Sequence, residues 1–223
     1  MSFSVERWLI SFQDTAQKSK ELITLLSVDE QERAKRFKFT ELQDRFIVGR
    51  GSLRQILGSY LQQHPAEIEF SYGEYGKPFV EKLSFNFSHT KEYALCVVSQ
   101  EEAIAVGVDI ETQDRGTQAL ALAQRFFHPD EYSYLQTVPV DKQQDIFLQF
   151  WTAKEAYLKA KGIGLQGGLD QFQIQLESTP HIICSDAENW SLKMFQINTN
   201  HQGAIAVNSA QCHHIDRGIW GAT

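Results

Sequence analysis

The chain has 223 residues, of which 42% are hydrophobic and 22% are charged. This composition is typical of globular proteins and excludes a disordered or fibrous chain, and the length suits one large domain or two small lobes. The formal net charge of −7 excludes a protein that coats nucleic acid, because a negative field repels the phosphate backbone.

No signal for a membrane or for secretion is found in the sequence. No apolar run approaches the roughly 20 residues that a membrane helix needs, and the first residues lack the basic and apolar regions of a secretory signal. The cysteines Cys96, Cys184 and Cys212 have no CxxC spacing, which suits free thiols in a reducing compartment. We therefore expect a cytoplasmic protein. Cys212-His213-His214 has no fourth ligand at metal-binding spacing and is interpreted as part of an ordinary C-terminal tail.

Hydrophobic periodicity predicts alternating helical and extended segments along the chain. Helices are predicted over residues 28–39, 44–61, 117–127 and 141–161, with a further helix starting near 128–131. Strands are predicted over residues 68–72, 83–87, 93–98, 103–111, 172–176, 190–198 and 204–207. The tetrapeptide Ala-Ile-Ala-Val occurs at 103–106 and again at 204–207. We therefore expect a duplicated, two-lobed α+β fold.

The predicted strand at 104–111 has two different faces. Ile104, Val106, Val108 and Ile110 form an apolar face, and Ala105, Gly107, Asp109 and Glu111 form the other. Two carboxylates therefore lie together beside Gly107, which we interpret as leaving room for a ligand. Paired carboxylates suit Mg²⁺, although an acidic strand end in solvent has the same pattern.

Two further segments carry polar residues that suit phosphate chemistry. Glu155 and Lys159 lie four residues apart on the most apolar predicted helix, either as a surface ion pair or as an enclosed acid and amine. If they are enclosed, Glu155 could complete a metal site or act as a base, and Lys159 could neutralise phosphate charge. His89 ends a strand and is either structural or a hydrogen-bond donor to a phosphate.

Near the N-terminus, four cations fall within six residues. They are Arg33, Lys35, Arg36 and Lys38. Such a run forms either a solvated helix face or a small anion site.

Taken in order, several motifs resemble the Sfp-type 4′-phosphopantetheinyl transferase family. They are Gly107-Val108-Asp109-Ile110-Glu111, Trp151-Thr152-Ala153-Lys154-Glu155-Ala156-Tyr157-Leu158-Lys159, Gly76-Lys77-Pro78, Asn86-Phe87-Ser88-His89 and the segment 125–132. The resemblance covers about residues 25 to 210. It implies transfer of the 4′-phosphopantetheine arm of coenzyme A to a serine hydroxyl of an apo acyl or peptidyl carrier protein, with release of 3′,5′-ADP.

The resemblance also assigns roles to residues. Asp109, Glu111 and Glu155 would hold Mg²⁺, Glu155 would take the serine proton directly or through a water, and Lys159 would face the phosphates. Lys77 and Pro78 would border the adenine, and Arg33, Arg45 and His89 would lie near the 3′-phosphate. The full set implied to bind coenzyme A is Arg33, Arg45, Gly76, Lys77, Pro78, Asn86, Ser88, His89 and Lys159. One position that is often basic in this family is Glu30 here.

Members of this length resemble a fused dimer, so the resemblance implies two similar lobes related by a pseudo-two-fold axis. We place them at residues 1–110 and 111–223, with the active site at their interface, and we expect a monomer. The carrier protein would belong to fatty acid, polyketide or nonribosomal peptide synthesis. We expect it to dock on the exposed part of Thr112–Asp145, because that segment lies between the two metal-site motifs in the sequence. Two alternatives stay open: a Mg²⁺-dependent nuclease or phosphohydrolase, and a non-catalytic module that binds carrier proteins.

Overall fold

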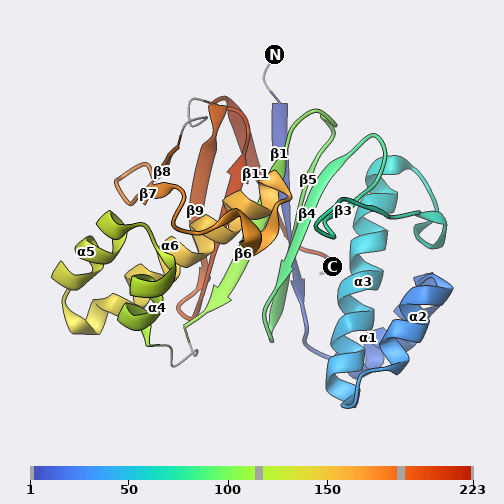
Figure 1. Ribbon diagram of the computed structural model, residues 1–223. Coiled ribbons are helices and arrows are strands. Elements are labelled where there is room, and N and C mark those ends of the chain that lie inside the picture. Colours follow the sequence, from blue (N-terminus) through green and yellow to red (C-terminus); the bar gives the residue numbers. More distant parts are fainter. Residues whose placement is uncertain (1–2, 114–117, 185–188, 222–223) are drawn as a thin grey trace.

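A computed structural model describes residues 3–113, 118–184 and 189–221 (Figure 1). The first half contains β1 (Phe3–Ser11), α1 (Thr15–Leu22), α2 (Val28–Lys35), α3 (Thr40–Leu61), β2 (Ser71–Tyr72), β3 (Pro78–Phe79), β4 (Ser84–His89) and β5 (Tyr93–Ser99). The second half contains β6 (Val106–Thr112), α4 (Ala119–Phe126), α5 (Pro129–Thr137), α6 (Val140–Lys161), β7 (Gln173–Gln175), β8 (His181–Ile183), β9 (Ser191–Asn198), β10 (His201–Val207) and β11 (Cys212–Ile219). Short 3₁₀ helices cover Ile23–Leu25, Pro65–Glu67 and Gly164–Gly167.

The two halves repeat one topology. Each half begins with a strand, which is followed by helices, the last of them 22 residues long. A small two-stranded hairpin and two further strands complete each half. The strand orders β1-β5-β4 and β6-β10-β9 correspond, because in each the last strand pairs with the first. The predicted two-lobed α+β fold is confirmed.

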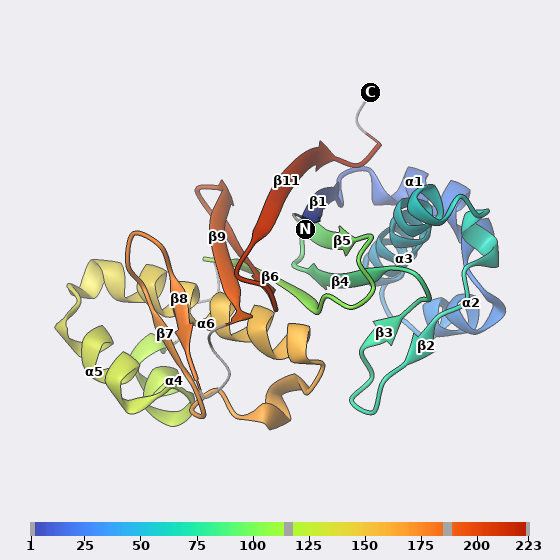
Figure 2. The same ribbon diagram turned by 90° about the horizontal axis from the view of Figure 1, so that it is seen from above.

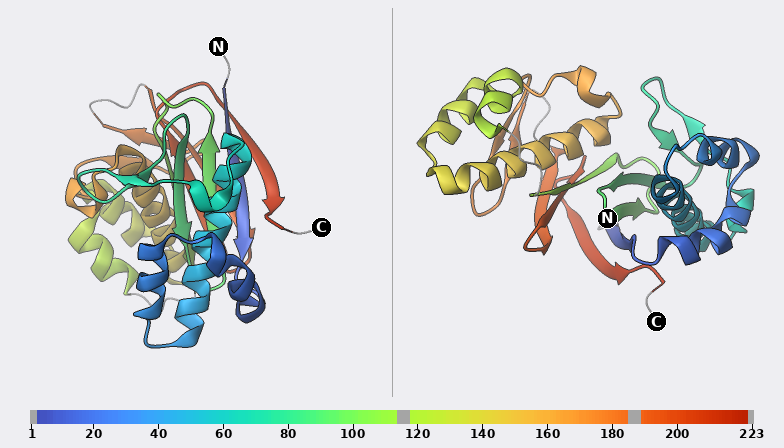
Figure 3. Two further views of the ribbon diagram at one scale, coloured as in Figure 1. Left: turned by 90° about the vertical axis from the view of Figure 1, so that its right-hand side faces the viewer. Right: turned by 90° about the horizontal axis from the view of Figure 1, so that it is seen from below.

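The sheets divide the chain differently from the predicted boundary at 110/111. That boundary falls inside β6, which pairs with β10 in the second sheet, so the repeated units run over residues 3–99 and 106–207. β11 then returns to the first sheet and pairs in parallel with β1, with Phe3 opposite Cys212 (Figures 2 and 3). The prediction of an ordinary tail at Cys212-His213-His214 was therefore wrong.

The predicted helices and strands are otherwise largely confirmed, with shifts at their ends. The strand expected at 103–111 begins at Val106, and α4 begins at Ala119, while Thr117 lies outside the described residues. β1 and α1 were not predicted. In the described part of the chain, none of the helices is both long enough and apolar enough for a membrane span.

Four layers build the molecule, with α3 and α6 outside and the two sheets between them (Figure 2). The cluster between the sheets contains Val5, Leu95, Val97, Val106, Val108, Ile110, Ile205 and Val207, all at most 2% exposed. Alternation in β6 therefore turns its apolar face toward the first sheet, and the face with Gly107, Asp109 and Glu111 toward α6. The edge strands β4 and β6 lie side by side, and Asn86 Oδ1 on β4 accepts a hydrogen bond from Val108 N at 2.9 Å.

Candidate active site

Gly107 sets the distance between β6 and α6. A Cβ atom at this position would lie 2.0 Å from the carbonyl oxygen of Ala156 and 2.3 Å from the amide nitrogen of Ala160. Only glycine therefore allows the strand to lie directly on the helix backbone. The interpretation that Gly107 leaves room for a ligand was wrong, because the main chain of α6 fills that space.

This close approach brings three polar side chains together at the junction of the lobes. Ser88 Oγ on β4 donates to Asp109 Oδ1 on β6 at 2.8 Å. Lys159 Nζ on α6 donates to the same Asp109 oxygen at 2.6 Å and to Ser88 Oγ at 3.0 Å. Asp109 is 3% exposed, so the acidic partner of this ion pair is buried. Lys159 is thus directed at the junction of the lobes, with its side chain 29% exposed.

The carboxylates around Lys159 keep it protonated. Burial works against the charged ammonium, but the carboxylate of Asp109, together with those of Glu155 and Glu111, raises the pKa of Lys159 above its ordinary value. Glu111 is 6% exposed and Glu155 is half-buried. The pKa of one cation is therefore raised by three carboxylates from two separate motifs, those of Asp109, Glu111 and Glu155.

The same carboxylates have the chemistry of a magnesium site. Asp109 Oδ2 is buried and has no hydrogen-bond partner among the described residues, so it is an acceptor open to a further ligand. Carboxylate oxygens are the ligands that Mg²⁺ prefers. Within the described ranges, however, no group of three or more His, Cys, Asp or Glu residues already converges as a metal cluster. The donor set fits Mg²⁺, and in this structure Lys159 supplies the positive charge.

Lys77 fastens the segment between β2 and β3 to both elements of this junction. Its Nζ donates to the carbonyl oxygens of Val106 at 3.0 Å and of Ala160 at 3.1 Å, next to the contact of Gly107 with α6. Burial lowers the pKa of Lys77 to about 8. Gly76 has a φ of 79° and forms the turn that leads into Lys77, with Pro78 following in β3.

A pocket of about 440 Å³ opens in the first lobe, beside the end of β4. Its walls are apolar side chains, including Phe12, Phe37, Leu42, Phe46, Leu53 and Phe87, and its cations are Arg33, Arg45 and Arg50. His89 also lines it. The structure thus brings Arg33, Arg45 and His89 together, as the resemblance implies, and adds Arg50, which sequence reasoning missed.

His89 lies between this pocket and the carboxylate junction. The removal of water from around its ring, aided by the positive charges of Lys159 and Arg45, lowers the pKa of His89, although Thr90 and Asp109 act in the opposite direction. Both cations therefore lie close enough to His89 for electrostatic interaction. A phosphate bound between Lys159 and Arg45 would offset their positive charge.

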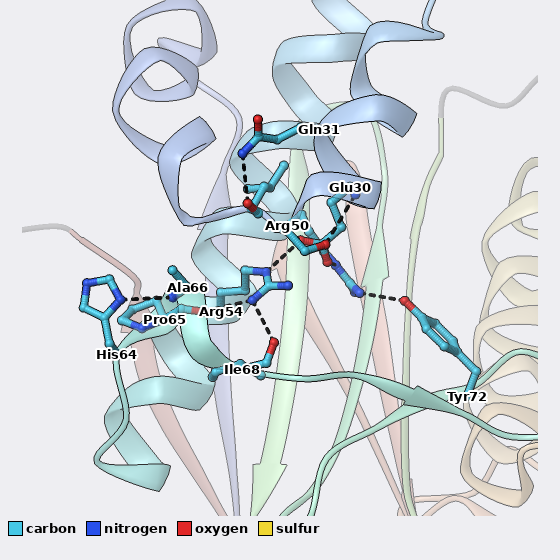
Figure 4. A network of polar contacts seen from close by, with 11 residues as sticks. Glu30, Gln31, Arg50, Arg54, His64, Pro65, Ala66, Ile68 and Tyr72 are labelled. Atoms are coloured by element: carbon cyan, nitrogen blue, oxygen red, sulfur yellow. Dashed lines mark hydrogen bonds and ion pairs between the residues drawn. The ribbon is translucent and has the colours of Figure 1, made fainter.

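Glu30 is a buried anchor of α2 (Figure 4). It accepts from Arg54 Nε at 2.7 Å and from Arg50 Nε, and its third donor is the backbone amide of Ser27 at 3.0 Å in a capping box. Burial opposes its ionisation, but these donors lower the pKa of Glu30. The sequence Ser27-Val28-Asp29-Glu30 carries the capping signal, which indicates the bond to Ser27 but not the contacts with Arg50 and Arg54.

Comparison with known proteins establishes the family. Residues 105–208 match the model of the 4′-phosphopantetheinyl transferase superfamily, and residues 11–102 match that of the 4′-phosphopantetheinyl transferase N-terminal region. The 4′-phosphopantetheinyl transferase HetI of Nostoc sp. is 39% identical over 213 residues, which cover 93% of this chain and 89% of HetI. The chain belongs to the 4′-phosphopantetheinyl transferase superfamily.

Other members support this assignment. A 4′-phosphopantetheinyl transferase of Bacillus subtilis is 33% identical over 171 residues, which cover 75% of this chain and 74% of the relative. The transferase Sfp of Bacillus subtilis is 28% identical over 195 residues, which cover 85% of each protein. The predicted family and the predicted enzyme class are confirmed.

In this transferase, Lys154 of the motif at residues 151–159 has a structural position that sequence reasoning missed. Lys154 is 0% exposed and pairs with Glu131 at 2.9 Å. It also donates to the carbonyl oxygens of Leu169 and Phe172, both at 2.7 Å. Lys154 therefore holds α5 and the segment after α6 in place, while Glu155 and Lys159 belong to the junction.

Proposed function

We propose that this transferase binds coenzyme A across the junction of its lobes and transfers the 4′-phosphopantetheine arm to a serine hydroxyl of an apo acyl or peptidyl carrier protein. The observation that carries the proposal is the contact of Ser88, Asp109 and Lys159 from three elements, next to a pocket lined by arginines. Phosphoryl transfer depends mainly on positioning and charge neutralisation, and this junction offers both.

The metal in this proposal is Mg²⁺, and Asp109, Glu111 and Glu155 would hold it. The fit rests on their carboxylate oxygens and on the open acceptor Asp109 Oδ2. When bound, Mg²⁺ would polarise the pyrophosphate and offset part of its negative charge. Lys159 would lie beside this site, since its Nζ is 2.6 Å from Asp109 Oδ1.

Lys159 and Ser88 would act on the phosphates. The Lys159 ammonium carries a fixed positive charge near the position where negative charge develops during transfer. The Ser88 hydroxyl can donate to a phosphate oxygen once Asp109 has turned to another ligand, since the hydroxyl hydrogen rotates freely.

Glu155 would be the base. The proton of the carrier serine passes to the Glu155 carboxylate, directly or through a water, as the serine oxygen bonds to the phosphorus of the arm. The bond from that phosphorus to the bridging oxygen breaks, and 3′,5′-ADP leaves with the electron pair. Glu155 suits this role because it is half-buried and one helical turn from Lys159.

The adenosine end of coenzyme A would occupy the first lobe. Arg33, Arg45 and His89 would hold the 3′-phosphate, which is supported by the cationic pocket in a chain of net charge −7. Gly76, Lys77 and Pro78 would border the adenine with main chain and with the Lys77 stem, because the Lys77 amine is engaged by carbonyl oxygens. Asn86 would support this site by holding β4 to β6.

The carrier protein would dock on Thr112–Asp145, of which residues 114–117 lie outside the described part. This segment contains Tyr134, which is 47% exposed beside a surface hollow shared with Pro139 and Ile146. One chain supplies both lobes of the junction, which supports action as a monomer. The unpaired thiols of Cys96 and Cys212 suit a cytoplasmic location.

Substitution of the base tests the assignment. Glu155→Gln should lower kcat by about 100-fold or more, while the Kd of coenzyme A, measured by calorimetry, should stay within about threefold of the unchanged protein, or ~0.6 kcal/mol. A variant that keeps its turnover and loses only coenzyme affinity would remove Glu155 from the chemical step.

A further inference from the structure

We propose that Arg50 is a third phosphate-binding cation of the pocket and that Glu30 holds it in position. This inference rests on the proposed function, since it assumes that the 3′-phosphate of coenzyme A enters the pocket lined by Arg33 and Arg45. It concerns a residue for which neither the sequence motifs nor the family resemblance implies a role.

Arg50 is already fixed in place at the wall of the pocket. Its side chain is 15% exposed, its Nε donates to Glu30, and its Nη2 donates to Tyr72 Oη at 2.9 Å. Its guanidinium also lies over the Phe70 ring, 3.9 Å from the centroid. A cation held by a carboxylate, a hydroxyl and a ring loses little conformational freedom when it binds an anion.

The positive charge of Arg50 is only partly neutralised within this cluster. The single carboxylate of Glu30 is shared by Arg50 and Arg54 (Figure 4). Arg54 is 2% exposed, so its charge depends on a buried counterion. One carboxylate between two guanidiniums carries a net charge of about +1, and of the two only Arg50 lines the pocket.

Glu30 also fixes Arg33, another cation of the pocket. It is part of α2, which carries Arg33, and its bond to Arg54 ties α2 to α3. Arg54 in turn donates to the carbonyl oxygens of Pro65 and Ile68, at 3.0 and 2.9 Å, so the anchor continues into the chain after α3. An acidic residue at position 30 therefore orients Arg33 and Arg50 around the pocket.

The test compares two arginines that share one carboxylate. The Kd values of coenzyme A and of dephospho-coenzyme A are measured by calorimetry for the unchanged protein, Arg50→Met and Arg54→Met. Arg50→Met should lower the ratio of the dephospho-coenzyme A Kd to the coenzyme A Kd by about tenfold, or ~1.4 kcal/mol. Arg54→Met is the comparison variant: because it keeps the Arg50 guanidinium at the pocket, it should lower the ratio less than Arg50→Met does, while lowering the urea midpoint of unfolding.

The outcomes separate this inference from the proposed function. If the unchanged protein prefers coenzyme A and Arg50→Met keeps that preference, Arg50 is only a structural partner of Glu30 and the inference is overturned. If the unchanged protein binds both ligands equally, the proposed 3′-phosphate site itself is refuted. Should Arg50→Met not fold, Arg50→Lys keeps the charge without the planar fork and should lower the ratio several-fold, and an unchanged ratio there overturns the inference.

Discussion

Replacing Gly107 with alanine should separate β6 from α6 and disrupt the site without removing any of its polar groups. The new Cβ would lie 2.0 Å from the Ala156 carbonyl oxygen, whereas ordinary contacts begin near 3.4 Å, so the two must move apart by about 1.4 Å. All three atoms within 3 Å of the new Cβ belong to the main chain of α6, so a side-chain rotation cannot relieve the overlap. The 2.6 Å contact of Lys159 with Asp109 would then lengthen to roughly 4 Å, beyond hydrogen-bond distance.

The expected cost falls on both stability and rate. Overpacking of this kind lowers the free energy of unfolding by about 1–3 kcal/mol. Misplacement of a catalytic group by about 1 Å lowers the rate by roughly 100-fold. Unfolding in urea gives the first quantity, and the initial rate of carrier modification, followed by intact-mass spectrometry, gives the second.

Two other glycines provide matched controls. A Cβ on Gly73 would meet only the Lys77 carbonyl oxygen at 3.7 Å, so Gly73→Ala should keep both stability and rate. A Cβ on Gly51 would lie 2.7 Å from Leu22 Cβ, away from the junction, so Gly51→Ala should lose stability while its folded fraction keeps its turnover. The reasoning is refuted if Gly107→Ala keeps a rate within about threefold of the unchanged protein, or ~0.6 kcal/mol in the barrier.

The site leads to three further predictions. Asp109→Ala should abolish transfer while the far-ultraviolet circular dichroism spectrum is kept, and full activity would exclude the metal assignment. His89→Ala should weaken binding of coenzyme A more than binding of dephospho-coenzyme A in calorimetry, whereas equal losses would place the 3′-phosphate elsewhere. Lys77 has a folded pKa of about 8, below the value of about 10.4 for an unfolded lysine, so between these pH values the unfolded chain binds more protons. The free energy of unfolding of the unchanged protein, relative to that of Lys77→Met, should therefore rise from pH 8 to pH 10, and a constant difference would contradict the burial of this amine.

Local patterns predicted much of the fold and the motifs of the site. Alternation along β6 separates Val106, Val108 and Ile110 from Asp109 and Glu111, and that separation depends only on the geometry of a strand. The spacing of Glu155 and Lys159 likewise needs only a helix. Residues of this kind can be assigned from the local sequence, because their grouping needs no partner from elsewhere in the chain.

Features that depend on distant partners could not be predicted. β1 and β11 pair with each other from opposite ends of the chain, and no local period encodes such a pairing. Gly107 faces the backbone of α6, about fifty residues later, which the strand pattern alone does not show. Glu30 seemed to be a missing cation, because its partners Arg50 and Arg54 are on another helix.

The most direct test of the account is intact-mass spectrometry of an apo acyl carrier protein, and in parallel a peptidyl carrier domain, incubated with this transferase, coenzyme A and Mg²⁺. At least one carrier should gain the mass of a single phosphopantetheine arm, and the gain should disappear with EDTA or with Asp109→Ala. Modification that continues unchanged in the Asp109→Ala variant would contradict the assignment of the junction as the transfer site.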